Sequence, residues 1–85
     1  MFDAGKFREL LIKYPKLAIV LLSGVVSKKL TRTMLDIDKW LVEDLYAALI
    51  TCGAVRGLTN ATFRATKEAE NYIKEEWINE HQNIQ

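Results

Sequence analysis

The segment after Gly53 constrains the fold most, because it interrupts a chain that is otherwise patterned for helices. Gly53 follows a long helical pattern, at the position where a helix end favours a left-handed residue. Apolar and basic residues alternate in Ala54–Arg56 and in Thr62–Ala65, and Gly57–Ala61 between them holds turn-forming glycine and asparagine. The sequence therefore predicts a β-hairpin over about residues 54–65, with one packed face and one solvated face.

The first part of the chain predicts two helices. In residues 3–14 apolar side chains recur at i, i+3, i+4 and i+7, Asp3 is a good N-cap, and Pro15 ends the pattern. Residues 15–28 predict a second, buried helix, since proline suits a helix start and no pairing strand lies nearby in the sequence. The β-branched residues within 17–26 leave a buried strand as the alternative.

A short helix or turn is predicted over residues 28–37, with Thr31 or Thr33 as its cap. It connects the apolar second segment to a longer helix. Its apolar residues are spaced to dock on the core.

The longer helix begins after Asp36 or Asp38, both good N-caps, and runs to Cys52. Thr66 is the expected N-cap of a closing helix that buries aromatic and aliphatic residues. The polar tail over residues 79–85 is expected to fray. With 85 residues, the chain is expected to form one domain, α+β and mostly helical.

One ordered set of residues runs through the second half of the chain: Leu45, Leu49, the run Gly53–Val55, the run Phe63–Ala69, Tyr72 and Ile73. With this set, residues 28–78 resemble the winged helix-turn-helix family of DNA-binding domains. In that family a long apolar helix ends at glycine, a two-stranded wing follows, and a Thr-(Lys/Glu)-Glu-(Gly/Ala) step opens the closing helix.

The resemblance implies binding to double-stranded DNA. In such proteins the long helix enters the major groove and the wing reaches the flanking backbone or minor groove. The implied function is that of a small, stand-alone transcriptional regulator, of a kind frequent in phages and mobile elements. The lone thiol and the lack of a signal peptide pattern predict a cytoplasmic protein. The implied DNA contacts are Lys28, Lys29, Thr31, Arg32, Thr33, Lys39, Arg56, Asn60 and Arg64.

Charge is uneven along the chain and supports an alternative. Residues 1–35 carry seven basic and two acidic side chains, a net +5, whereas residues 36–66 carry −1 and residues 67–85 carry −3. The start of the long helix is acidic, which would repel phosphates. The alternative is therefore a winged-helix protein-interaction module, an inhibitor or adaptor that acts through its acidic face. A third reading, an all-helical bundle, would hold if residues 54–65 formed a loop.

Other functions find little support in the residue types present. A single cysteine, Cys52, and a single histidine, His81, offer no convincing nucleophile–base pair or metal site, so we expect no enzyme and no cofactor. The longest uncharged stretch is about half of a membrane span. Trp40 is expected to be partly buried. Trp77 and Ile78 are candidates for a seam with a second copy, and otherwise for closing the core of the monomer.

Overall fold

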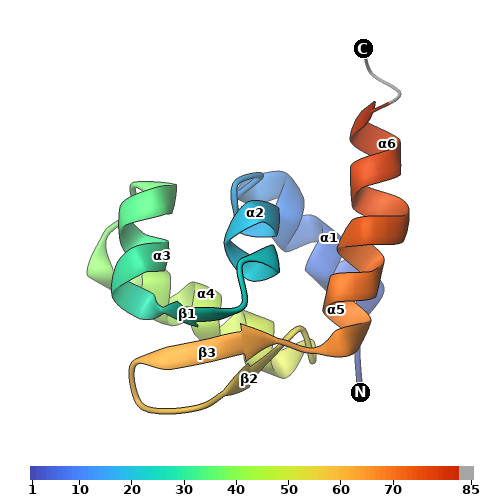
Figure 1. Ribbon diagram of the computed structural model, residues 1–85. Helices are drawn as coiled ribbons and strands as arrows, with labels where there is room; N and C mark the ends of the chain where they lie inside the picture. The colour runs from blue at the N-terminus through green and yellow to red at the C-terminus, as the bar shows by residue number, and fades with distance from the viewer. Residues whose placement is uncertain (83–85) are drawn as a thin grey trace.

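Helices dominate the computed structural model, which describes residues 1–82 (Figure 1). They pack around a small sheet that lies along the lower edge of the view in Figure 1. The elements in chain order are α1 (Ala4–Lys13), α2 (Leu17–Leu22), β1 (Val25–Ser27), α3 (Lys28–Leu35), α4 (Lys39–Thr51), β2 (Val55–Gly57), β3 (Thr62–Ala65), α5 (Lys67–Tyr72), the π-helical turn η1 (Ile73–Trp77) and α6 (Ile78–Gln82).

β3 is the middle strand of a three-stranded antiparallel sheet with the order β1-β3-β2. On the inner face Val26 pairs with Phe63, and both side chains are buried in the core. Successive side chains of a strand point to opposite faces, so Arg64, which follows Phe63, lies on the outer face. The hairpin predicted over residues 54–65 is therefore confirmed, and the all-helical reading is wrong.

The helix predicted over residues 15–28 is wrong beyond Leu22. Gly24 takes a positive φ of 101° that turns the chain out of α2, and Val25–Ser27 then forms β1. The pairing strand that seemed absent is β3, which comes more than thirty residues later. Long-range strand pairing thus overrides the helical pattern here. The β-branched side chains, which favour strands, are consistent with this outcome.

The caps of α3 and α4 fix how these two helices meet. The Ser27 hydroxyl accepts a hydrogen bond from the Leu30 amide at 2.9 Å, so Ser27, not a threonine, caps α3. Asp38 caps α4 through the Leu41 amide, also at 2.9 Å. Asp36, the other predicted cap, instead ends α3 with a left-handed φ of 54°.

Both ends of the hairpin are anchored. Gly53 takes a positive φ of 77°, as predicted for the residue after α4. The Thr66 hydroxyl caps α5 through the Ala69 amide and donates to the carbonyl of Gly53, which joins the end of α4 to the start of α5. These bonds fix the hairpin to the two helices that flank it. A hairpin alone is only marginally stable in water, so it depends on this support.

The closing helix is longer than its sequence suggested. α5, η1 and α6 follow one another through Gln82, so the fray predicted from Asn79 is wrong for residues 79–82; residues 83–85 lie outside the described residues. Figure 1 shows α6 rising beyond the rest of the domain. Arg8 of α1 forms two hydrogen bonds of 2.5 Å with the carboxylate of Glu80, which tie α6 to the body.

The core lies between the inner face of the sheet and the helices. It includes Phe7, Leu21, Leu49, Phe63 and Ile73, all with at most 1% of their surface exposed. The domain measures 36 × 27 × 20 Å. Among residues 1–82, no helix is both long and apolar enough to cross a membrane.

Candidate nucleic-acid interface

Two of the predicted DNA contacts, Arg56 and Arg64, face each other across the hairpin. They are directly paired in the register of β2 and β3, and both are exposed on the outer face of the sheet. Val25 of β1 pairs with Arg64 on its other side and is also exposed. We call this row of Val25, Arg64 and Arg56 the outer row.

The outer row brings two positive charges together without compensation. Like charges directly opposite one another in a sheet destabilise it. Among the described residues, neither guanidinium has a carboxylate within ion-pair distance. An open hollow beside the arginines continues over Lys67 at the start of α5, and Glu68 and Glu70 also line it. Two adjacent guanidinium groups that form no ion pair are suited to the phosphates of an anionic ligand, whereas the carboxylates of Glu68 and Glu70 would repel a phosphate in the rest of the hollow.

The α3 candidates differ from one another in exposure. Lys29 and Arg32 are exposed, and neither forms an ion pair among the described residues, so both can reach a ligand. Thr33 is exposed, and its hydroxyl donates to the carbonyl of Lys29 at 3.0 Å. The prediction for Thr31 is wrong: its side chain is 2% exposed, and its hydroxyl donates to the Ser27 carbonyl inside the helix.

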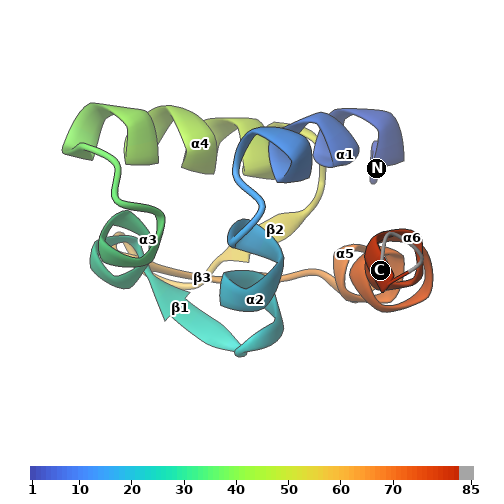
Figure 2. The ribbon, with the colours of Figure 1, turned by 90° about the horizontal axis from the view of Figure 1, so that it is seen from above.

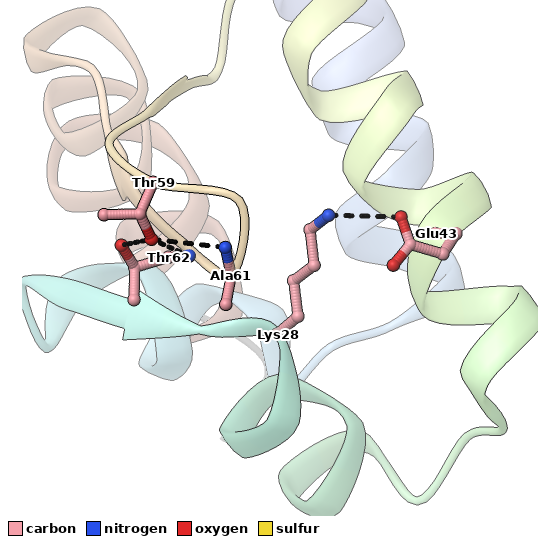
Figure 3. A network of polar contacts seen from close by, with 5 residues as sticks. All are labelled: Lys28, Glu43, Thr59, Ala61 and Thr62. Carbon is pink, nitrogen blue, oxygen red and sulfur yellow. Dashed lines mark hydrogen bonds and ion pairs between the residues drawn. The ribbon is translucent and has the colours of Figure 1, made fainter.

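Lys28 is held by α4 and does not project freely into solvent. Its ammonium group donates to the carboxylate of Glu43 at 3.1 Å (Figure 3). The same group lies 4.3 Å from the centre of the Tyr46 ring. The lysine thus joins α3 to α4. It neutralises one of the acidic side chains that the sequence placed on the long helix.

The hairpin loop is ordered by its own side chains. The Thr59 hydroxyl accepts hydrogen bonds from the amides of Ala61 and Thr62 and also contacts the Thr62 hydroxyl at 2.7 Å (Figure 3). The Ala61 carbonyl accepts from the Lys28 amide at 2.8 Å, so the loop is docked on the start of α3. Asn60, a predicted DNA contact, is exposed in this loop and can reach a ligand.

The exposed side of α4 is apolar and acidic. Trp40 is 73% exposed, which makes the expectation of partial burial wrong, and Leu41 and Ile50 are about 40% exposed. The acidic Asp44 is exposed without an ion pair among the described residues. Lys39 lies over the Trp40 ring at 5.5 Å. A helix with this surface has few groups that favour phosphate or base contacts.

The predicted seam at the C-terminal helix is not available. Trp77 is only 6% exposed and belongs to the core, so it closes the monomer, and Ile78 packs partly buried against the same cluster. The exposed side chains of this helix are polar: Lys67, Glu68, Asn71, Lys74, Glu75, Glu76, Asn79 and Glu80. Polar side chains of this kind give a second copy no apolar surface to bury.

Metal and thiol chemistry find no site in the part of the chain that the structure describes. No group of three or more potential metal ligands occurs there. Cys52 is buried at the end of α4, and its burial raises the pKa of the thiol. A thiol that resists ionisation is a poor nucleophile.

Val25 is the one residue of the outer row that the sequence did not predict for this face. Val25 was assigned to a helix, and its place beside Arg64 depends on the pairing of β1 with β3. The alternation of residues in the hairpin put Arg56 and Arg64 on the solvated face but did not fix their register. Comparison of the chain with protein-family models, curated proteins and solved structures finds no match.

Proposed function

We propose that this chain is a winged-helix protein that binds double-stranded DNA through the outer row and the exposed side of α3. α3 and α4 are two helices joined by a short turn, and an antiparallel hairpin follows them, as in a helix-turn-helix with a wing. Transcriptional regulation is the role that such a domain, acting alone, would have. The observation that carries the proposal is the Arg56–Arg64 pair, two exposed cations held opposite each other with no carboxylate partner.

The proposed contacts are mainly to the DNA backbone. Lys29 and Arg32 on α3 and the two arginines of the outer row would each neutralise a phosphate, and Asn60 in the loop would add a hydrogen bond. The orientation on DNA differs from that implied by the family, because Trp40 and Asp44 occupy the exposed side of the long helix. Backbone contacts position a protein and supply affinity that depends strongly on salt.

A salt-dependent binding titration tests the proposal. Binding of the full chain to a labelled mixed-sequence duplex is measured by fluorescence anisotropy at several salt concentrations. For the double variant Arg56→Ala/Arg64→Ala we expect the slope of log K against log salt to fall by about 2, because each lost phosphate contact removes about 0.9. The matched control is Lys6→Ala/Lys74→Ala, which removes two exposed positive charges from other elements.

Two outcomes would overturn the proposal. One is that the wild-type chain shows no binding to the duplex at low salt. The other is that the arginine double variant and the control lose the same affinity and slope, which would mean that only total charge matters.

A protein-interaction module is the second candidate, and the exposed Trp40 favours it. Aromatic side chains are enriched at the centres of protein interfaces, and this one stands beside exposed carboxylates on α4. Substitution of Trp40 or Asp44 would then abolish capture of a partner and leave DNA affinity unchanged.

A further inference from the structure

The surface between α1 and α4 is grooved and apolar. Figure 2 shows both helices along the same face of the molecule. A hollow between them has an apolar floor and is lined by Leu10, Lys13, Tyr14, Leu41, Asp44, Leu45 and Ala48. A second hollow adjoins it, since Lys13 and Tyr14 line both, and it continues to Pro15, Lys16 and Leu35. We call the two hollows together the α1–α4 groove.

The two sides of the groove carry opposite charges. Lys13 and Lys16 belong to the α1 side, and Asp44 belongs to the α4 side. Lys13 and Asp44 form no ion pair with each other or with another described residue. The exposed Trp40 precedes Asp44 by one helical turn on the same side of α4, which puts a large apolar side chain at the acidic edge of the groove.

This charge pattern complements itself. If two copies face each other across a two-fold axis that runs along the groove, the acidic side of each copy lies over the basic side of the other. Lys13 of one copy then meets Asp44 of the second copy, and the contact occurs twice. The same rotation carries Trp40 of each copy towards the α1 side of the other groove, where Tyr14 is half-buried. A duplex is a poor occupant, because Asp44 would repel it, and a uniformly basic peptide would meet Lys13 and Lys16.

We propose that the α1–α4 groove is a homodimer interface, with Trp40 as its apolar anchor and Lys13–Asp44 pairs between the copies. This inference does not rest on DNA binding. Trp77, which the sequence suggested as a dimer contact, is buried in the core, whereas Trp40 is exposed. The outer row belongs to the sheet and not to this groove, so a dimer would present two copies of it.

Sedimentation equilibrium of the full chain over a micromolar to millimolar range tests the proposal. We expect a concentration-dependent dimer for the wild type and a monomer for Trp40→Ala at every concentration. Lys13→Asp and Asp44→Lys should each weaken dimerisation about tenfold, since symmetry doubles the effect of each substitution. The double variant Lys13→Asp/Asp44→Lys should restore the wild-type dissociation constant, because it exchanges the two charges.

Controls separate this interface from misfolding and from other partners. Lys74→Asp reverses an exposed charge on another helix and should leave the dimer unchanged. Circular dichroism should show each variant folded, because Trp40, Lys13 and Asp44 are all exposed. A wild type that stays monomeric at millimolar concentration would overturn the proposal, as would a double variant no better than the single ones. The second result would mean that Lys13 and Asp44 do not meet between the copies.

Discussion

The outer face of the sheet and the exposed side of α4 are both solvent-facing, yet their chemistry is opposite. The sheet presents two arginines with no acidic partner, whereas α4 presents exposed tryptophan, leucine and isoleucine together with the carboxylate of Asp44, which forms no ion pair among the described residues. Lys28 at the start of α3 donates its amide to the hairpin loop and its ammonium group to Glu43 of α4. The difference indicates that a polyanion would be met by the sheet, while α4 offers a surface better suited to protein.

The position of α4 in the fold suggests a DNA contact that its surface chemistry does not support. In the family that the sequence resembles, this helix reads the major groove, and here its position after a short turn and before a hairpin fits that expectation. Its side chains do not, because a groove reader needs donors and positive charge. Position in the fold and surface chemistry are separate properties, and the second decides what can bind.

Removing Phe63 should have the largest effect, because this residue supports both regions. Its ring is buried beneath the sheet and lies 5.4 Å from the ring of Tyr46 on α4. We expect Phe63→Ala to lower the free energy of unfolding by about 3–5 kcal/mol through lost burial and a cavity. Urea denaturation measures this. Leu58→Ala in the exposed loop is the control and should change it by less than about 0.5 kcal/mol.

Gly53 lies between α4 and the hairpin, and its replacement should have the next largest effect. Its φ is 77°, and a Cβ there would lie 2.6 Å from the Met1 carbonyl oxygen. Gly53→Ala should therefore cost more than the roughly 1–2 kcal/mol of a left-handed alanine alone. Gly24→Ala is the matched comparison, because it has φ of 101° and open space around it. Equal thermal shifts for the two variants would contradict this account.

A substitution in the arginine pair should have a smaller effect on stability, and it should stabilise the domain. Arg56→Thr should stabilise the domain by about 0.2–1 kcal/mol, because it removes the repulsion across the hairpin and places a good strand former there. The gain should shrink in high salt, which screens exposed charges. Thermal unfolding at low and high salt measures both effects. A variant less stable than wild type at both concentrations would show that the guanidinium groups do not repel.

Ionisation of Cys52, at the end of α4, should have the smallest effect on stability. Its pKa is raised in the folded chain, so at high pH the unfolded chain loses the thiol proton more readily, and stability falls as pH rises. The loss should be absent at neutral pH and be at most about 0.4 kcal/mol at the ordinary thiol pKa of about 8.5. Cys52→Ala should lack this difference in urea denaturation across pH. A parallel pH profile for the variant would contradict the assignment to the thiol.

Local signals predicted those elements whose cause is local. Asp38 and Thr66 cap their helices and Gly53 ends α4 as expected, because each residue acts within one turn of its own position. β1 was missed because its partner β3 lies far along the chain, and no local pattern specifies that pairing. The same non-local pairing adds Val25 to the outer row.

The candidate site was predictable only in part, for the same reason. Alternation put Arg56 and Arg64 on one face, but only the register shows that they are opposite each other. The burial of Thr31 and the capture of Lys28 by Glu43 follow from how α3 packs on α4, which the spacing of charges could not reveal. Exposure of Trp40 likewise depends on which side of α4 the core covers.

Amide chemical-shift mapping of the full chain with a mixed-sequence duplex tests the division between the two regions most directly. The account predicts that the largest shifts fall on Val25, Arg56 and Arg64 of the sheet and on Lys29 and Arg32 of α3. The exposed positions of α4, represented by Trp40, Ala47 and Ile50, should change little. Shifts concentrated on α4, with the sheet unchanged, would contradict the account.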